Sequence, residues 1–230
     1  MASNLAARRA AKANRRKAVV VGKRKVELMS GSLVAQVSAA ASQPIRACLI
    51  NDGWMDAGMA TMFLTRGVSN NRLGFGMFLL DPYCLGIKDV AFKSMNADEW
   101  EAFLDASEYA MPLSPLDPGF GRKLLRDLAA WSASMGFAPH PDFAAVERLF
   151  GTVSADTCTT EFPFGREGKP FYIQGPSDTP AQARQYLAQV SRASGGSGKI
   201  LLVEPDELDI ELPSLARMAG VDHSAADTSD

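Results

Sequence analysis

The densest group of chemically useful side chains in this 230-residue chain spans residues 81–89, read as Asp-Pro-Tyr-Cys-Leu-Gly-Ile-Lys-Asp. It follows an apolar run, and functional sites are often built where a strand passes into a loop. Cys84 is the candidate nucleophile, with Lys88 and Asp89 beside it. The alternative is a buried cysteine that packs as a small apolar side chain, next to a surface pair formed by Lys88 and Asp89.

Nucleophilic chemistry at Cys84 requires a base, and His140 is the one plausible base in the sequence. Asp89 or Asp142 would orient the imidazole. The structural alternative to catalysis is that His140 caps or flanks the start of a helix, because Pro141 suits the first helical position and Asp142 complements the positive helix end. These residues define the alternative of a small cytosolic enzyme.

A second candidate binding segment runs from 168 to 178 and combines aromatic side chains with a Gly-Pro turn. Lys169 and Tyr172 are the residues in it that suit an anion or a base. Aromatic residues in such a segment also pack against sheets, with Pro170 at an edge.

Motifs for cofactors and metals are incomplete. Residues 193–200 have the spacing of a phosphate loop, but Ile200 stands where a magnesium-binding hydroxyl is needed. Gly74 and Gly76 lack the third glycine of a dinucleotide fingerprint and instead indicate a bulge or a close backbone approach. No metal or cofactor is predicted, because ligand-like spacing is missing among Cys48, Cys84, Cys158, His140 and His223.

The distribution of charge along the chain is the strongest indication of function in the sequence. The net charge is -2, but residues 1–26 hold nine basic residues and no acid, and the other 204 hold 15 basic and 26 acidic residues. An unopposed basic arm favours nucleic acid through phosphate neutralisation. The absence of aromatic residues gives no basis for base stacking by the arm. The basic residues are Arg8, Arg9, Lys12, Arg15, Arg16, Lys17, Lys23, Arg24 and Lys25.

Other partners for the arm are an acidic protein surface and the acidic body and tail of the chain itself. Residues 204–230 carry eight acids and one arginine. Membrane contact is not expected, because the arm lacks bulky apolar anchors. Three well-separated cysteines and the lack of a long apolar segment predict a cytoplasmic protein.

Local patterns predict the elements that position these residues. Strands are expected at 45–50, 60–66 and 73–80, the last two as a hairpin. Helices are expected at 32–42, from Asn96 to about 109, from Asp117 to 136, at 141–150 and from Thr179 onward. Extended segments are expected at 157–164 and 171–174.

Three segments resemble a family of uncharacterised bacterial proteins. They are FLLDPYCLGIKD at 78–89, GFAPHPDF at 136–143 with RLFG at 148–151, and FGREGKPFYIQGPSD at 164–178. The resemblance covers about residues 45–180. It implies a bacterial cytoplasmic origin and one continuous domain, and it assigns no catalytic residue.

Together these features predict a single α+β domain at 28–193, with a small, mostly antiparallel sheet packed by amphipathic helices. A basic arm precedes it at 1–27, and a linker, a short apolar segment and an acidic tail follow at 194–230. The expected function is non-catalytic binding, with the arm engaging nucleic acid or a ribonucleoprotein. The alternatives are the enzyme centred on Cys84 and an adaptor that binds only protein.

Overall fold

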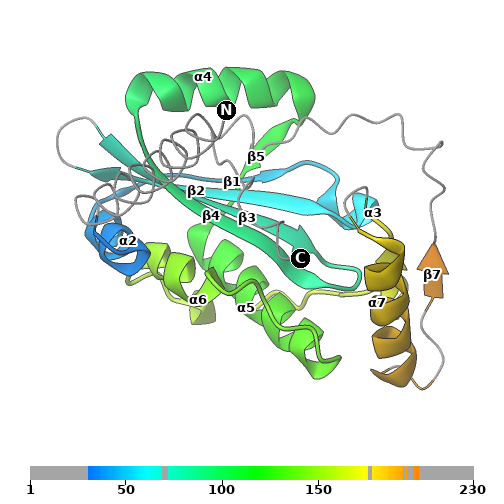
Figure 1. The fold of residues 1–230 in the computed structure, drawn as a ribbon. Helices are drawn as coiled ribbons and strands as arrows, with labels where there is room; N and C mark the ends of the chain where they lie inside the picture. Colours follow the sequence, from blue (N-terminus) through cyan, green and yellow to red (C-terminus); the bar gives the residue numbers. More distant parts are fainter. Residues whose placement is uncertain (1–30, 69–71, 176–177, 194, 196–198, 202–230) are drawn as a thin grey trace, which may run out of the picture.

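A computed structural model describes residues 31–68, 72–175, 178–193, 195 and 199–201 of the chain. Its centre is an antiparallel sheet of five strands in the order β4-β3-β2-β1-β5 (Figure 1). The strands are β1 (Ile45–Asn51), β2 (Ala60–Val68), β3 (Arg72–Asp81), β4 (Gly86–Asn96) and β5 (Leu113–Pro115). The predicted α+β single domain is confirmed.

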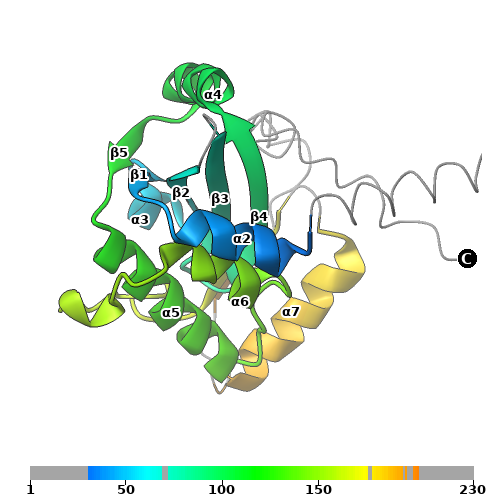
Figure 2. The ribbon, with the colours of Figure 1, turned by 90° about the vertical axis from the view of Figure 1, so that its left-hand side faces the viewer.

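The helices lie on both faces of this sheet. They are α2 (Leu33–Ala41), α3 (Trp54–Ala57), α4 (Ala97–Ala110), α5 (Pro118–Ser134), α6 (Phe143–Val146) and α7 (Pro180–Ala193), with 3₁₀ turns η1 (Glu147–Phe150) and η2 (Ala155–Thr157). Figure 2 shows α4 on one side of the sheet, and α2, α5 and α6 on the other.

Alternation along the strands builds a separate core on each face. On β2, Met62 and Leu64 pack with the α5 side, whereas Phe63 packs toward α4. This follows because successive strand side chains point to opposite faces. Trp100 and Phe103 of α4 complete the second core, and the Phe103 ring lies 5.1 Å from that of Phe63.

The predicted caps hold α4 and α5 in place. The Asn96 side chain accepts a hydrogen bond from the Glu99 amide at 2.8 Å, and the Glu99 carboxylate accepts one from the Asn96 amide. This is the reciprocal capping box. Asp117 accepts from the amide of Phe120 at 2.9 Å and precedes Pro118 at the first helical position.

A second, smaller sheet lies beside the turn between β3 and β4. Strands β6 (Phe171–Ile173) and β7 (Lys199–Leu201) pair in parallel, and α7 packs beside β6. The Tyr186 ring of α7 lies 5.4 Å from that of Tyr172. Cys84 and Leu85, in the turn between β3 and β4, pack in one apolar cluster with Tyr172 and Val190, so the two sheets share one domain.

Two predicted elements have different bounds, and one strand was not predicted. The helix expected at 141–150 begins at Phe143 and passes into the turn η1, and the extended segment expected at 157–164 starts only after η2, which ends at Thr157. Strand β4 was not predicted, although it is the longest of the sheet. A bulge beside Leu79 and Leu80 interrupts its alternation, so its apolar residues do not recur at the period of two that marks a strand.

Candidate functional site

Asp81 organises the turn that carries the first candidate group. It ends β3, is 4% exposed, and its Oδ1 accepts hydrogen bonds from the amides of Tyr83 at 3.0 Å and Cys84 at 2.8 Å. Burial raises the pKa of Asp81 above its ordinary value, and the positive charge of Lys88 opposes that shift. The carboxylate is committed to backbone donors, so its role here is to shape the turn.

Cys84 is fully buried in an apolar cluster that includes Met135, Phe137 and Tyr172. Burial, reinforced by the charge of Asp81, raises the pKa of the thiol well above its ordinary value. A reactive cysteine needs the opposite, an accessible thiol with a lowered pKa. The arrangement therefore favours packing over nucleophilic chemistry.

The structure does bring His140 and Asp89 together. His140 Nε2 lies 3.7 Å from Asp89 Oδ1, and both side chains are 27% exposed. The imidazole is oriented from its other nitrogen, because Nδ1 accepts a hydrogen bond from the Asp142 amide at 3.2 Å. The backbone amide of His140 also donates to the carbonyl of Ile87 at 3.1 Å, which ties this loop to β4.

The separation of 3.7 Å between His140 Nε2 and Asp89 Oδ1 is longer than a hydrogen bond, and both ring nitrogens already face protein groups, Nδ1 the Asp142 amide and Nε2 the Asp89 carboxylate. A general base needs one nitrogen turned toward its substrate, so this arrangement suits a contact between the 140–142 loop and β4 better than proton transfer. In the part of the chain that the structure describes, no hydrogen bond joins the Cys84 thiol to His140. The nucleophile and base of the enzyme alternative are therefore not connected here. Lys88 lies on β4, as Asp89 does, and its ammonium group lies near Gly175.

Of the two residues predicted to bind a ligand in segment 168–178, Lys169 is accessible to solvent and Tyr172 is not. Lys169 is exposed, and its backbone pairs with that of Arg166. Tyr172 is fully buried and its hydroxyl donates to Asp178 Oδ2 at 2.9 Å. Burial and this bond to Asp178 raise the pKa of the tyrosine. Lys169 remains available to an anion, whereas Tyr172 is already satisfied internally.

Residues 81–89 and 164–178 meet in space, which the sequence did not predict. The amide of Phe171 donates to the carbonyl of Tyr83 at 2.9 Å. A Cβ built on Gly175 would lie 3.6 Å from Lys88 Nζ and 3.1 Å from Asp178 Oδ2. The Lys88 ammonium group therefore lies near Gly175 and the Asp178 carboxylate that binds Tyr172.

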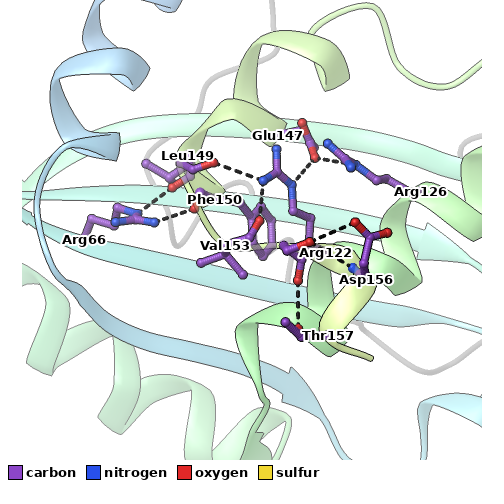
Figure 3. Close-up of polar contacts among 11 residues, drawn as sticks. Arg66, Arg122, Arg126, Glu147, Leu149, Phe150, Val153, Asp156 and Thr157 are labelled. Carbon is purple, nitrogen blue, oxygen red and sulfur yellow. Dashed lines mark hydrogen bonds and ion pairs between the residues drawn. The ribbon is translucent and has the colours of Figure 1, made fainter. Parts of the chain in front are cut away.

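A cluster of arginines forms a further polar centre (Figure 3). Arg122 Nε lies 2.6 Å from Glu147 Oε1, and Arg126 Nε lies 2.9 Å from the same oxygen. Arg122 Nη1 also donates to the carbonyls of Gly151 and Val153. Burial alone would raise the pKa of Glu147, but bonding to the two arginines lowers it overall.

Arg66 approaches this cluster from β2 and is 6% exposed. Its Nη1, Nε and Nη2 donate to the backbone carbonyls of Gln43, Leu149 and Phe150. Arg66 was not among the residues predicted from the sequence. The signal was present, since a lone charge inside the apolar run 60–66 requires internal partners.

An open pocket of about 290 Å³ lies between α2 and the neighbouring strands β3 and β4. Its lining consists of Gln36, Ala39, Ala40, Arg72, Gly74, Phe92 and Ser94. Gly74 was predicted to mark a bulge or a close backbone approach, and the close approach is confirmed, because a Cβ there would lie 2.4 Å from the Cβ of Ala40. The lining as a set was not predicted, because α2 and β4 contribute to it from distant parts of the sequence.

The nine basic residues of the arm and His223 lie outside the described residues. Among the residues that are described, no group of three or more His, Cys, Asp or Glu side chains could hold a metal ion. No helix in that part of the chain is both long and apolar enough to span a membrane.

Comparisons with protein-family models, with curated proteins and with solved structures give no match for this chain.

Proposed function

We propose that this protein is a non-catalytic binding protein whose basic arm, residues 1–27, associates with nucleic acid or a ribonucleoprotein. The observation that carries the proposal is the segregation of charge. Nine Lys and Arg residues fall in the first 26 positions without an acid, whereas residues 31–201 are nearly balanced, with 14 basic and 17 acidic residues. The positive charge is thus concentrated in one segment.

The chemistry of this arm suits a polyanion. Lys and Arg side chains neutralise phosphates and release condensed counterions, which gives affinity that falls steeply with salt. The acids are enriched at the other end of the chain, where residues 204–230 hold eight acids and one arginine. The full burial of Cys84, which raises the pKa of its thiol, adds support for a binding role over one in which Cys84 is the nucleophile.

The test is a fluorescence-anisotropy titration of labelled DNA and RNA, each single-stranded and duplex, at several salt concentrations. The full chain is compared with a chain lacking residues 2–26 and with one in which the nine basic residues are replaced by Gln. Because six to ten phosphate contacts give an affinity loss of about 10³ to 10⁵ between 50 and 200 mM salt, we expect a steep slope for the full chain.

Both altered chains should lose that binding and its salt dependence. Retention by either altered chain at the affinity of the full chain would overturn the proposal. Polyglutamate serves as the probe for the rival partner, an acidic protein surface. If it binds the full chain as tightly as the nucleic acids do, the preference for phosphate is refuted.

A further inference from the structure

The pocket on the α2 face of the sheet combines one cation, one aromatic ring and neutral polar groups. Arg72 and Phe92 supply the charge and the ring, and Gln36 and Ser94 supply the amide and the hydroxyl. Among the described residues that line it, none is acidic. Its volume of about 290 Å³ lies just below the range of about 300–1,000 Å³ that is usual for small-molecule sites, so it suits part of a ligand such as one nucleotide unit.

Gly74 lines this pocket where α2 approaches β3 most closely. A Cβ at this position would lie 2.4 Å from the Cβ of Ala40 and 3.3 Å from the ring of Phe92. The missing side chain therefore lets α2 pack directly on β3, with Phe92 beside the contact.

Arg72 is held at the pocket in a defined orientation. Its Nε donates to Ser94 Oγ at 3.0 Å and its Nη2 to the Ser94 carbonyl at 3.3 Å. Nη1 makes no hydrogen bond to any residue that the structure describes. Because a guanidinium has five donors, Arg72 can bind an anion without releasing Ser94.

The pocket is adjacent to the point where the arm joins the domain. Gln36 Nε2 donates to the carbonyl of Gly31 at 3.2 Å. Gly31 is the first described residue after the N-terminal segment, and Gln36 lines the pocket. The pocket therefore lies beside the first residue that the structure describes after the arm.

We propose that this pocket receives one nucleotide of a single-stranded nucleic acid, with Arg72 binding its phosphate and Phe92 contacting its base. The inference rests on the proposed function of the arm and adds a preference for unpaired strands. Arginine with an aromatic ring is the combination that binds single strands without sequence specificity. A base within a duplex is stacked and paired, so it cannot enter a pocket of this kind.

The experiment measures the affinity of full-length variants for a labelled oligothymidylate and for a DNA duplex of equal length. Arg72→Ala and Phe92→Leu should each weaken binding of the single strand about tenfold, since stacking and charged contacts of this kind contribute at this level. Duplex affinity should change less than twofold.

Matched variants control for charge and for packing. Lys93→Ala removes the same charge from the next position on β4, where the side chain points to the opposite face. Phe162→Leu truncates a half-buried phenylalanine that packs on Phe120 of α5. Neither should alter the preference for single strands. Thermal unfolding of every variant confirms that the comparison is made between folded proteins.

The outcomes separate this inference from the function on which it rests. Equal weakening of single-strand and duplex binding by Arg72→Ala, or no weakening by either pocket variant, would overturn the pocket while leaving the arm's role intact. Unchanged binding after replacement of the nine basic arm residues would overturn the arm's role itself. A selective loss of single-strand binding in Arg72→Ala and Phe92→Leu supports the pocket, and a loss of binding after replacement of the arm residues supports the arm's role.

Discussion

Arg66 Nη2 donates a hydrogen bond of 2.6 Å to the carbonyl oxygen of Phe150, 84 residues later in the chain. The same guanidinium also binds the carbonyls of Leu149 and Gln43. One side chain of β2 thereby satisfies backbone acceptors at the end of η1 and at the loop after α2. This contact fixes two helical segments on the sheet face that carries the pocket.

Replacing Arg66 should therefore be strongly destabilising. In Arg66→Met three backbone carbonyls lose their donor, and we expect the free energy of unfolding to fall by about 3 kcal/mol or more. Urea titration measures this. The exposed Arg46 of β1 is the control, and Arg46→Met should change stability by less than about 0.5 kcal/mol. Equal effects of the two substitutions would contradict the assigned role of Arg66.

Gly74→Ala tests the close contact of α2 with β3. Because the new methyl group would lie 2.4 Å from the Cβ of Ala40, α2 must move, and a loss of about 1–3 kcal/mol is expected. Gly67 provides the comparison, since the nearest atom to a Cβ there is 3.6 Å away. Gly67→Ala should be neutral or slightly stabilising. Chemical denaturation of both variants decides the point, and a neutral Gly74→Ala would refute it.

The three cysteines should differ in their reaction with a chromogenic thiol reagent at neutral pH. Cys48 and Cys84 are buried, and burial raises the pKa of Cys48 to about 12 and that of Cys84 further. Cys158 is partly exposed. One thiol should react quickly in the native protein and all three after denaturation. Peptide mapping identifies the first site, and rapid labelling of Cys84 would instead favour the enzyme alternative.

The pH dependence of stability should report the bonds between Glu147 and the two arginines. The pKa of Glu147 is lower in the folded protein than in the unfolded chain. Its contribution is thus present above the unfolded value, about 4.3, and is lost as the pH falls through the folded value.

Glu147→Gln should cost about 2 kcal/mol at neutral pH, with the difference from the original chain shrinking below about pH 4. Urea midpoints across this range provide the measurement. Glu101 is exposed on α4, so Glu101→Gln serves as the control and should show little pH-dependent difference. A deficit in Glu147→Gln that is constant with pH would argue against the ionic role.

The sequence alone determined the features that depend on neighbouring residues. The capping box of Asn96 and Glu99, the cap at Asp117 and the hairpin strands β2 and β3 follow from local hydrogen bonding and side-chain period. The charge of the arm is likewise a property of composition, and its partner remains a prediction.

Tertiary structure decided the features that depend on residues far apart. Strand β4 forms by pairing with β3. Its sequence did not predict a strand, because polar residues and a bulge at Lys88 interrupt the alternation of apolar side chains. The burial of Cys84, the placement of Lys88 beside Asp178 and the pocket at Arg72 all arise where distant segments pack together. Local patterns contain no information about such contacts, since the free energy that selects them comes from the whole core.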